Sequence, residues 1–269
     1  GHGERLSRVL YWRGWSERLV PGKYHIVDGE SIGDVAHQLA TGDRESVRII
    51  VPAGRDLDVI AGKIATRIAA DSVEVLNLIR PDSIRWQIIP NTYDMWWETD
   101  AVGAINRLIN ESQIWWTSER LEKAKIQGVS AEEAVILASI VQAETSVLSE
   151  APIVAGLYLN RLKIGQALQA DPTLIYAWDD ISITRVLDIH KAIDSPYNTY
   201  KNTGLPPGTI RTPEPTFIDA VLNPAEHDYL YMCAEPGGTG KHVFEKRYRD
   251  HLKNARKYQK WLNKNRIYR

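Results

Sequence analysis

The sequence of 269 residues is poor in cysteine and has no long apolar run. Its single cysteine, Cys233, excludes an internal disulfide framework and a metal site built from several cysteines. No stretch approaches the roughly 18 to 20 apolar residues that span a bilayer, and no signal-peptide core follows the opening segment. With 33 basic and 34 acidic residues the net charge is -1, so we do not expect nucleic acid as a partner.

Phenylalanine is also scarce, since two Phe stand against nine Trp and twelve Tyr. Trp and Tyr carry a polar group on a flat ring and suit surfaces that are half wet. Grooves that bind sugars use such rings, and so do ordinary protein cores. The aromatic content therefore allows a glycan-binding surface without requiring one.

The first part of the chain predicts a small α+β unit. Apolar and polar residues alternate over residues 23–27, which predicts a strand. A helix is expected from residue 32 to Gly42, and "SVRIIVP" predicts a second strand. A helix with Ile60, Ile64 and Ile68 on one stripe comes next. "YHIVDGESIGDVAHQLATG" in this unit resembles a LysM module, a glycan-binding fold.

The remainder of the chain predicts mainly helices. One long amphipathic helix is expected from Asp100 to Gly128, with Trp115 facing the core and Trp116 exposed. Near the end, "FIDAVLNP" predicts a short helix, "DYLYMCA" and "HVFEK" predict two strands across a Gly-rich turn, and a polar helix begins at about residue 247. We therefore predict an α+β protein.

A carboxylate stands where an apolar side chain is expected in "IVQAETS". Leu137, Val141, Glu144 and Leu148 are spaced so that they share one helix face, which places Glu144 at the end of a buried stripe. Partial burial and the negative end of the helix dipole both raise the pKa of a carboxyl group. A Glu protonated near neutral pH is suited to general acid catalysis, although an Arg partner or a loop-capping role would explain it equally well.

The elements around Glu144 favour a cleft. Ser130 and Glu133 form a capping box that begins its helix. Ser149 is expected to cap a second helix, "APIVAGLYLNRLKIG", with Leu157 and Arg161 on one face. Glu144 thus lies at a junction of two helices.

Several motifs in this order resemble the endolytic murein transglycosylases of the YceG-like family. They are "YHIVDGESIGDVAHQLATG", "IPNTYDMWW", "LASIVQAETS", "LYLNRLKIGQALQADPTLIYA", "SPYNTYKNTGLPPGTI", "LNPAEHDYLYMCA" and "HVFEK". Where many relatives carry an acid two positions before the catalytic Glu, this chain has Gln142. Because Gln142 is two residues away on the helix, it is expected to face elsewhere.

The resemblance implies cleavage of the MurNAc-GlcNAc bond inside nascent peptidoglycan strands, which ends their elongation. The family's catalytic Glu falls on Glu144. In the implied mechanism Glu144 protonates the glycosidic oxygen and then, as a carboxylate, removes the proton of the C6 hydroxyl of the same MurNAc. That hydroxyl attacks C1 and gives a 1,6-anhydro product.

The resemblance and the residue types together suggest further substrate-binding residues, namely Asn91, Tyr93, Asn160, Gln169, Asp171, Tyr197, Asn198, Tyr200 and His242. Asp171 is a candidate second carboxylate or a turn residue before Pro172. The "SPYNTY" segment mixes flat rings and amides, as sugar recognition requires, and also makes a sound turn. His242 is a substrate-site residue or a structural one.

The resemblance also implies domains and surroundings. We expect a remnant of a removed membrane anchor at 1–21, a LysM-like domain at 22–85 and a mainly helical catalytic domain with a small β-element at 86–269. The family is anchored in the cytoplasmic membrane by one N-terminal helix, with the catalytic part on the periplasmic or extracellular side. Glycan strands are the expected partner, together with cell-wall synthases.

No cofactor or metal ion is expected. "GGTGKH" lacks the spacing G-x-x-x-x-G-K-[ST] of a phosphate loop, and the histidines lack metal-ligand spacing. Two other functions remain open at this point. The chain is alternatively a non-catalytic peptidoglycan-binding scaffold, or a hydrolytic muramidase that uses Asp171 with water.

Overall fold

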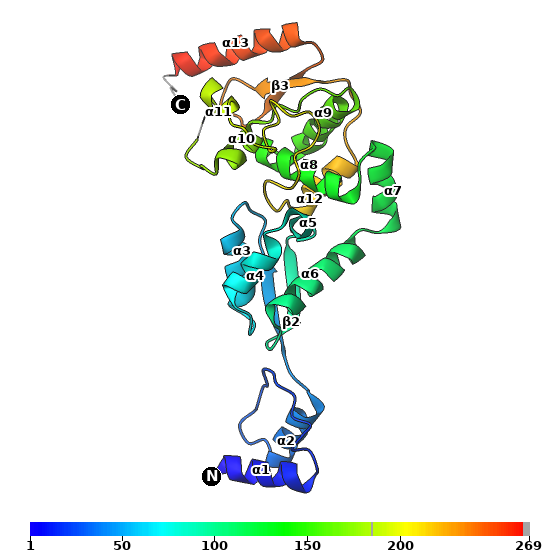
Figure 1. Ribbon diagram of the computed structural model, residues 1–269, viewed down its shortest axis with the longest axis vertical. Helices are drawn as coiled ribbons and strands as arrows, with labels where there is room; N and C mark the ends of the chain where they lie inside the picture. The colour runs from blue at the N-terminus through cyan, green and yellow to red at the C-terminus, as the bar shows by residue number, and fades with distance from the viewer. Residues whose placement is uncertain (184, 266–269) are drawn as a thin grey trace. The chain divides into compact units, whose positions relative to one another are not determined.

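The computed structural model describes residues 1–183 and 185–265 (Figure 1). The chain forms two compact units, and each is described by itself. The first comprises Gly1–Pro52, Leu57–Arg80 and Asn91–Leu108, and the second comprises Ala53–Asp56, Pro81–Pro90 and Ile109–Arg269. The domain division near residue 85 stays a prediction.

The first unit is a two-stranded sheet with helices packed on it. Its elements are α1 (His2–Trp12), α2 (Ile32–Thr41), β1 (Ser46–Val51), α3 (Leu57–Ala65), α4 (Ser72–Ile79), β2 (Asn91–Trp96) and the first part of α6 (Ala101–Trp115). β1 and β2 pair antiparallel, with Ile49 opposite Tyr93. Both of these side chains are buried, so one face of the sheet contributes to the core of the unit.

The helix and second strand predicted at the start of this unit are confirmed. Ser31 caps α2 by accepting a hydrogen bond from the Asp34 amide, and Gly42 ends it with φ of 72°. The strand predicted for residues 23–27 is wrong. Only Lys23 pairs there, in an isolated bridge with Glu45. The likeness to a LysM module stays a prediction.

The single helix predicted from Asp100 to Gly128 is wrong. It is divided into α6 and α7 (Ser118–Gln127), and Thr117 caps α7 by accepting from the Arg120 amide. The tryptophans are also reversed from the prediction, since Trp116 is buried and Trp115 is half-buried beneath the Arg120 guanidinium. The apolar pattern continues across this position, but the side-chain hydrogen bond of Thr117 begins a new helix there.

The second unit is mainly helical. After α5 (Asp82–Arg85) and α7, its elements are α8 (Ala131–Glu144), the 3-10 turn η1 (Leu148–Glu150), α9 (Ala151–Lys163), α10 (Asp171–Trp178), α11 (Asp188–Lys191), α12 (Pro215–Leu222), β3 (Tyr231–Ala234), β4 (His242–Glu245) and α13 (Tyr248–Lys264). The short helix, the two antiparallel strands and the last helix predicted for this region are confirmed.

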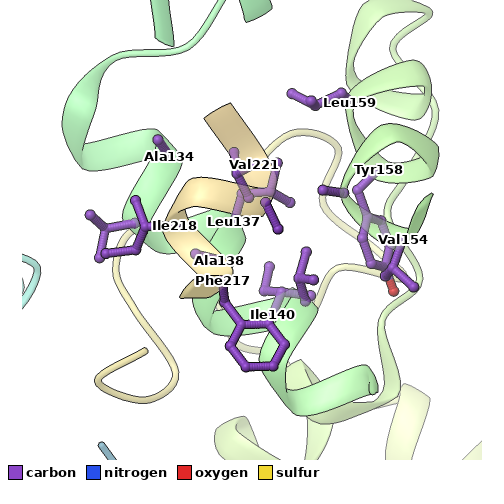
Figure 2. Close-up of a cluster of buried hydrophobic side chains, with 14 of the residues drawn as sticks. Ala134, Leu137, Ala138, Ile140, Val154, Tyr158, Leu159, Phe217, Ile218 and Val221 are labelled. Atoms are coloured by element: carbon purple, nitrogen blue, oxygen red, sulfur yellow. The ribbon is translucent and has the colours of Figure 1, made fainter. Parts of the chain in front are cut away.

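The core of the second unit lies between α8, α9 and α12. Figure 2 shows Leu137 and Ile140 of α8, Val154 of α9, and Phe217 and Val221 of α12 gathered in one cluster. α8 is buried on every side, because each residue from Ala134 to Val141 is buried. A helix that is apolar all round is a central helix, and α8 holds its C-terminal residue in a fixed place.

The corner between α8 and α9 differs from the prediction in two respects. α8 ends at Glu144 because Thr145 is extended, with φ of -135° and ψ of 138°, so Leu148 does not continue the buried stripe and is exposed. Ser149 does not cap α9. It lies within η1, and Glu150 takes the N-cap position of α9 with its side chain directed to other partners.

Candidate active site

A cavity of about 240 Å³ opens beside the last residue of α8. The chain segments that line it come from α8, α9, the loop before α10, the start of α10, the loop that carries Tyr200, β3 and α13. The lining residues are Glu144, Leu157, Tyr158, Arg161, Leu168, Gln169, Asp171, Tyr200, Tyr231, Met232, Tyr248 and His251. Glu144, Gln169, Asp171 and Tyr200, which the sequence suggested, are therefore brought together at one place.

Glu144 is held at the cavity wall by the helix that carries it. The capping box begins α8 as predicted, since Ser130 Oγ accepts from the Glu133 amide and Glu133 Oε2 accepts from the Ser130 amide at 2.7 Å. Gln142 faces away, as expected, and accepts a hydrogen bond from the Glu214 amide. α8 is thus anchored at its start and along its length, which leaves Glu144 little freedom.

The Glu144 carboxyl group has a raised pKa. Burial raises it to about 7, the negative charge of Asp171 acts in the same direction, and the hydrogen bond from Tyr158 and the charge of Arg161 oppose them. The direction predicted from the sequence is confirmed. At neutral pH the group is present in both protonation states, which suits a residue that must first give and then take a proton.

Tyr158 of α9 is the direct partner of Glu144. Its hydroxyl donates to Glu144 Oε1 over 2.6 Å. The ring is 2% exposed and belongs to the core, so the hydroxyl is fixed in position. Burial and the neighbouring carboxylate raise the pKa of Tyr158 far above its ordinary value, and its proton remains available for donation to Glu144. Sequence reasoning missed this residue, although a buried Tyr in "VAGLYLN" requires a hydrogen-bond partner.

Asp171 and Tyr200 form a second polar pair in the cavity. The Tyr200 hydroxyl donates to Asp171 Oδ1. Asp171 is the first residue of α10, where a negative charge is stabilised by the helix dipole. Asp171 thus begins a helix before Pro172 and also lines the cavity, and its role as a second carboxylate stays a prediction.

The loops that carry this pair are fastened to each other. Thr199 Oγ1 accepts from the Ala170 amide and lies 2.8 Å from Thr173 Oγ1, and the Thr199 carbonyl accepts from the Gln169 amide. Gln169 has φ of 51°, an unfavourable value for a residue with a side chain. The hydrogen bonds of Thr199 hold the Gln169 backbone in this conformation, and the exposed Gln169 side chain lines the cavity.

Arg161 forms part of the cavity floor. It is buried, and its guanidinium donates to the carbonyls of Leu230, Ala167 and Leu168 at 2.6, 3.3 and 2.6 Å. Through these bonds α9 is joined both to the loop before α10 and to the start of β3. Arg161 therefore assembles the walls of the cavity and places a positive charge near Glu144.

An aromatic wall, formed by Tyr231, Tyr248 and His251, completes the cavity. Tyr231 lies on β3, and the other two lie on α13. Their ring centroids are 5.5 to 6.0 Å apart. The sequence did not single out these residues, because the last helix read as a polar surface helix and no local pattern indicated a site.

Hydrogen bonds of the Glu150 side chain brace the corner that follows Glu144. The Glu150 carboxylate accepts from the His242 amide at 2.9 Å, lies 2.9 Å from His242 Nδ1, and accepts from Thr145 Oγ1 at 3.4 Å. His242 is not among the residues that line the cavity. Its position favours the structural alternative, in which it joins β4 to Glu150, which in turn accepts a hydrogen bond from Thr145 next to Glu144.

Three other residues suggested by the sequence form hydrogen bonds within the protein. Asn160 donates to the carbonyls of His227 and Tyr229. Tyr197 donates to Asp82 Oδ2 at 2.9 Å, and Asn198 is fully buried in a network of backbone groups. These side chains do not line the cavity, and their roles in substrate binding stay predictions.

Asn91 and Tyr93 lie on β2 in the first unit. Tyr93 is buried in the core of that unit, and Asn91 is exposed with its side-chain oxygen accepting from the Thr92 amide. Their predicted contact with substrate remains untested.

The chemistry of the cavity is that of a proton-transfer site. Within residues 1–183 and 185–265, no group of His, Cys, Asp or Glu side chains could hold a metal ion. Glu144, with a pKa of about 7, shares the cavity with the Tyr158 hydroxyl, the hydrogen-bonded pair of Asp171 and Tyr200, and the aromatic wall. A carboxyl group whose pKa lies near neutrality is suited to general acid-base chemistry.

Comparisons with known proteins identify the family. The chain belongs to the YceG-like family, whose pattern matches residues 4–257. A Bacillus subtilis (strain 168) protein named endolytic murein transglycosylase is 30% identical over 266 residues, which covers 88% of this chain and 72% of the relative. A protein of the same name from Streptococcus pneumoniae serotype 2 (strain D39 / NCTC 7466) is 32% identical over 135 residues, covering 49% of this chain and 24% of the relative.

The fold has a counterpart among solved structures. The crystal structure of a yceG-like protein from Listeria monocytogenes matches with a TM-score of 0.63 and 24% sequence identity, over 93% of this chain and 89% of that one. This likeness supports the fold. Among the described helices of the present chain, none has both the length and the apolar composition that crossing a membrane requires.

Proposed function

We propose that this protein is an endolytic peptidoglycan lytic transglycosylase that cleaves the MurNAc-GlcNAc bond and leaves 1,6-anhydroMurNAc ends. The observation that carries the proposal is Glu144, a carboxyl group with a pKa of about 7 at the wall of a cavity, hydrogen-bonded to a buried Tyr158. Membership of the YceG-like family and relatives named endolytic murein transglycosylase support the same reaction.

In this mechanism Glu144 acts first as an acid and then as a base. The protonated carboxyl group gives its proton to the glycosidic oxygen as the bond to C1 breaks. The resulting carboxylate takes the proton of the C6 hydroxyl while that oxygen bonds to C1, so Glu144 ends the cycle protonated. Because the nucleophile belongs to the same sugar, the step has an effective-molarity advantage of roughly 7 to 11 kcal/mol at best.

The neighbours of Glu144 serve the two halves of the cycle. The fixed Tyr158 hydroxyl stabilises the carboxylate form, and Arg161 adds a positive charge in the same direction. Desolvation and Asp171 favour the protonated form. Because these effects oppose each other, Glu144 can be either a protonated carboxyl group or a carboxylate near neutral pH. A single residue that acts as both acid and base requires this.

Mass spectrometry of the reaction products tests the proposal. Uncrosslinked glycan strands are incubated with wild type and with Glu144→Gln, a replacement of nearly equal shape that still accepts the Tyr158 hydrogen bond. Anhydro-MurNAc ends from wild type and none from the variant are expected. Full strand cleavage by Glu144→Gln would overturn the assignment of Glu144.

A hydrolytic muramidase is the second candidate, because Asp171 shares the cavity with Glu144. Glycosidases that use water employ two carboxyl groups that flank the bond. The same experiment separates the two reactions, since hydrolysis leaves a reducing end that is heavier by one water than the anhydro product. Cleavage by neither protein, with strands bound, would favour a peptidoglycan-binding scaffold.

The surroundings of the enzyme are part of the proposal. Its glycan strands are those of the cell wall, outside the cytoplasmic membrane, and we place the catalytic unit there, anchored to that membrane by an N-terminal helix as in the family. Cell-wall synthases are the proposed protein partners, and the LysM-like segment is the proposed second glycan contact. Co-purification of synthases with the membrane-bound protein would support this arrangement.

A further inference from the structure

Tyr248 is the most exposed of the aromatic rings that line the cavity. It is the first residue of α13 and is 57% exposed. Its hydroxyl makes no hydrogen bond within the part of the chain that the structure describes. Because Tyr248 also lines the cavity, its exposed ring is available to a ligand bound there.

Two neighbouring rings support the Tyr248 ring. Tyr248 lies 5.5 Å from Tyr231 and 6.0 Å from His251, centroid to centroid, and is stacked on the latter at 27°. Tyr231 in turn lies under the Arg161 guanidinium at 5.4 Å, and that group is fixed by its carbonyl partners. The aromatic wall is therefore formed before a ligand arrives, which lowers the entropy lost on binding.

His251 adds a polar feature to the wall. Its Nδ1 is buried and has no hydrogen-bond partner among the described residues. Burial, together with the charge of Arg161, lowers the pKa of His251, so the ring is neutral near pH 7. A neutral ring stacks as a flat apolar surface and brings no net charge to the cavity.

We propose that Tyr248, supported by His251 and Tyr231, forms a platform for the glycan strand. The face of one N-acetylated pyranose ring packs against the Tyr248 ring. The polar edge of that sugar is then directed toward Gln169 and Asp171, on the other elements that line the same cavity. The C-terminal helix α13 is thereby part of the substrate site. The identity of the ligand rests on the proposed function.

The packing chemistry fits a pyranose ring. Such a ring has hydroxyl and amide groups on its edge and C–H groups on its faces, so it matches a cavity with polar side chains on some walls and rings on another. Tyr supplies a large flat contact area with little conformational freedom to lose. Stacking of this kind contributes to the binding of the strand and not to the chemistry at Glu144.

The test measures binding without cleavage. In the Glu144→Gln protein, Tyr248→Ala is expected to raise the Kd for uncrosslinked glycan strands about tenfold, the effect of losing one ring contact. Tyr248→Phe, which keeps the ring, is expected to change Kd by about twofold or less. Tyr248→Leu preserves apolar contact without a flat ring and is expected to bind like the Ala variant.

The matched control lies on the same helix. Tyr258 of α13 stacks on Trp261 with centroids 5.9 Å apart and does not line the cavity. Tyr258→Ala is expected to leave the Kd unchanged. An unchanged Kd in both folded variants, Tyr248→Ala and Tyr248→Leu, would overturn the platform.

The outcome also distinguishes the platform from the proposed function. If wild type produces anhydro ends and Tyr248→Ala keeps the wild-type KM, the platform is wrong and the transglycosylase proposal stands. If wild type cleaves nothing while strands bind in a Tyr248-dependent manner, the platform stands and the catalytic proposal is wrong.

Discussion

The Tyr158 hydroxyl donates a hydrogen bond of 2.6 Å to Oε1 of Glu144. The two residues come from consecutive helices, α8 and α9, whose facing sides form the core of the second unit. The bond therefore joins the candidate catalytic group directly to the buried core of the second unit. Its effect on the pKa of Glu144 opposes that of burial.

Replacing Tyr158 by Phe is expected to shift the pH profile of activity. The reaction starts with protonated Glu144, so kcat/KM of wild type falls as pH rises through the pKa of about 7. Tyr158→Phe removes a hydrogen bond to the carboxylate, which raises this pKa further and moves the fall to higher pH by about one unit. Looser placement of Glu144 lowers kcat about tenfold. Steady-state rates between pH 5 and 9 measure both effects.

Tyr197→Phe is the control for this experiment. Its hydroxyl also donates to a carboxylate, Asp82, but the residue does not line the cavity. We expect a lower stability and an unchanged pH profile. A Tyr158→Phe profile that coincides with that of wild type would show that the hydroxyl does not act on Glu144.

Glu144→Gln is expected to stabilise the protein at alkaline pH. The pKa of Glu144 is raised by folding, so between pH 4.5 and about 7 the folded state binds more protons than the unfolded state. Stability therefore decreases as pH rises across this window, by roughly 3 kcal/mol at most. The neutral Gln avoids this loss, and its free energy of unfolding should exceed that of wild type at pH 8 by more than at pH 4.5. Urea unfolding at the two pH values checks this; a constant difference would contradict it.

Local sequence signals predicted the parts of the site that depend on one element. Ser130 and Glu133 marked the start of α8, and the apolar spacing placed Glu144 at the end of a buried helix with a raised pKa. The capping box depends only on neighbours in the same helix, and the apolar spacing of that helix indicated the burial that raises the pKa. The motif resemblance then indicated Gln169, Asp171 and Tyr200, which line the cavity.

Features that depend on packing between distant segments were missed. Tyr158 becomes the partner of Glu144 only through the angle at which α9 meets α8, and no residue pattern in either helix encodes that angle. The aromatic wall requires β3 and α13 to fold back beside α8. The division at Thr117 was missed because a polar side chain that caps a helix also fits within one, and only the tertiary structure decides between them.

Arg161 is expected to be essential for stability. Arg161→Met leaves the carbonyls of Leu230, Ala167 and Leu168 without a donor in a buried setting, and we expect the free energy of unfolding to drop by about 3 to 5 kcal/mol. Lys163→Met on the exposed side of the same helix should change it by about 0.5 kcal/mol or less. Equal effects of the two substitutions in urea unfolding would show that the carbonyl contacts contribute nothing.

Asn198 holds the loop that carries Tyr200. Its Nδ2 donates to the carbonyls of Lys191 and Ile193 at 3.0 and 2.8 Å, and its Oδ1 accepts from the Tyr200 amide at 3.0 Å. Since the residue is fully buried, Asn198→Ala leaves these groups without water or protein partners. We expect a loss of about 2 to 4 kcal/mol in the free energy of unfolding.

The position of Tyr200 gives this substitution a second consequence. The Tyr200 hydroxyl donates a hydrogen bond to Asp171 in the cavity. Because a loosened loop would displace this pair, we expect weaker substrate binding, with KM raised more than kcat is lowered. Asn202→Ala in the same loop is the control, because Asn202 is exposed and its bonds to Ser195 and Asn198 can be replaced by water. Its expected effect on stability is about 1 kcal/mol or less, with KM unchanged. A KM for folded Asn198→Ala equal to that of wild type would mean that the Tyr200 loop is held by Thr199 and its partners alone.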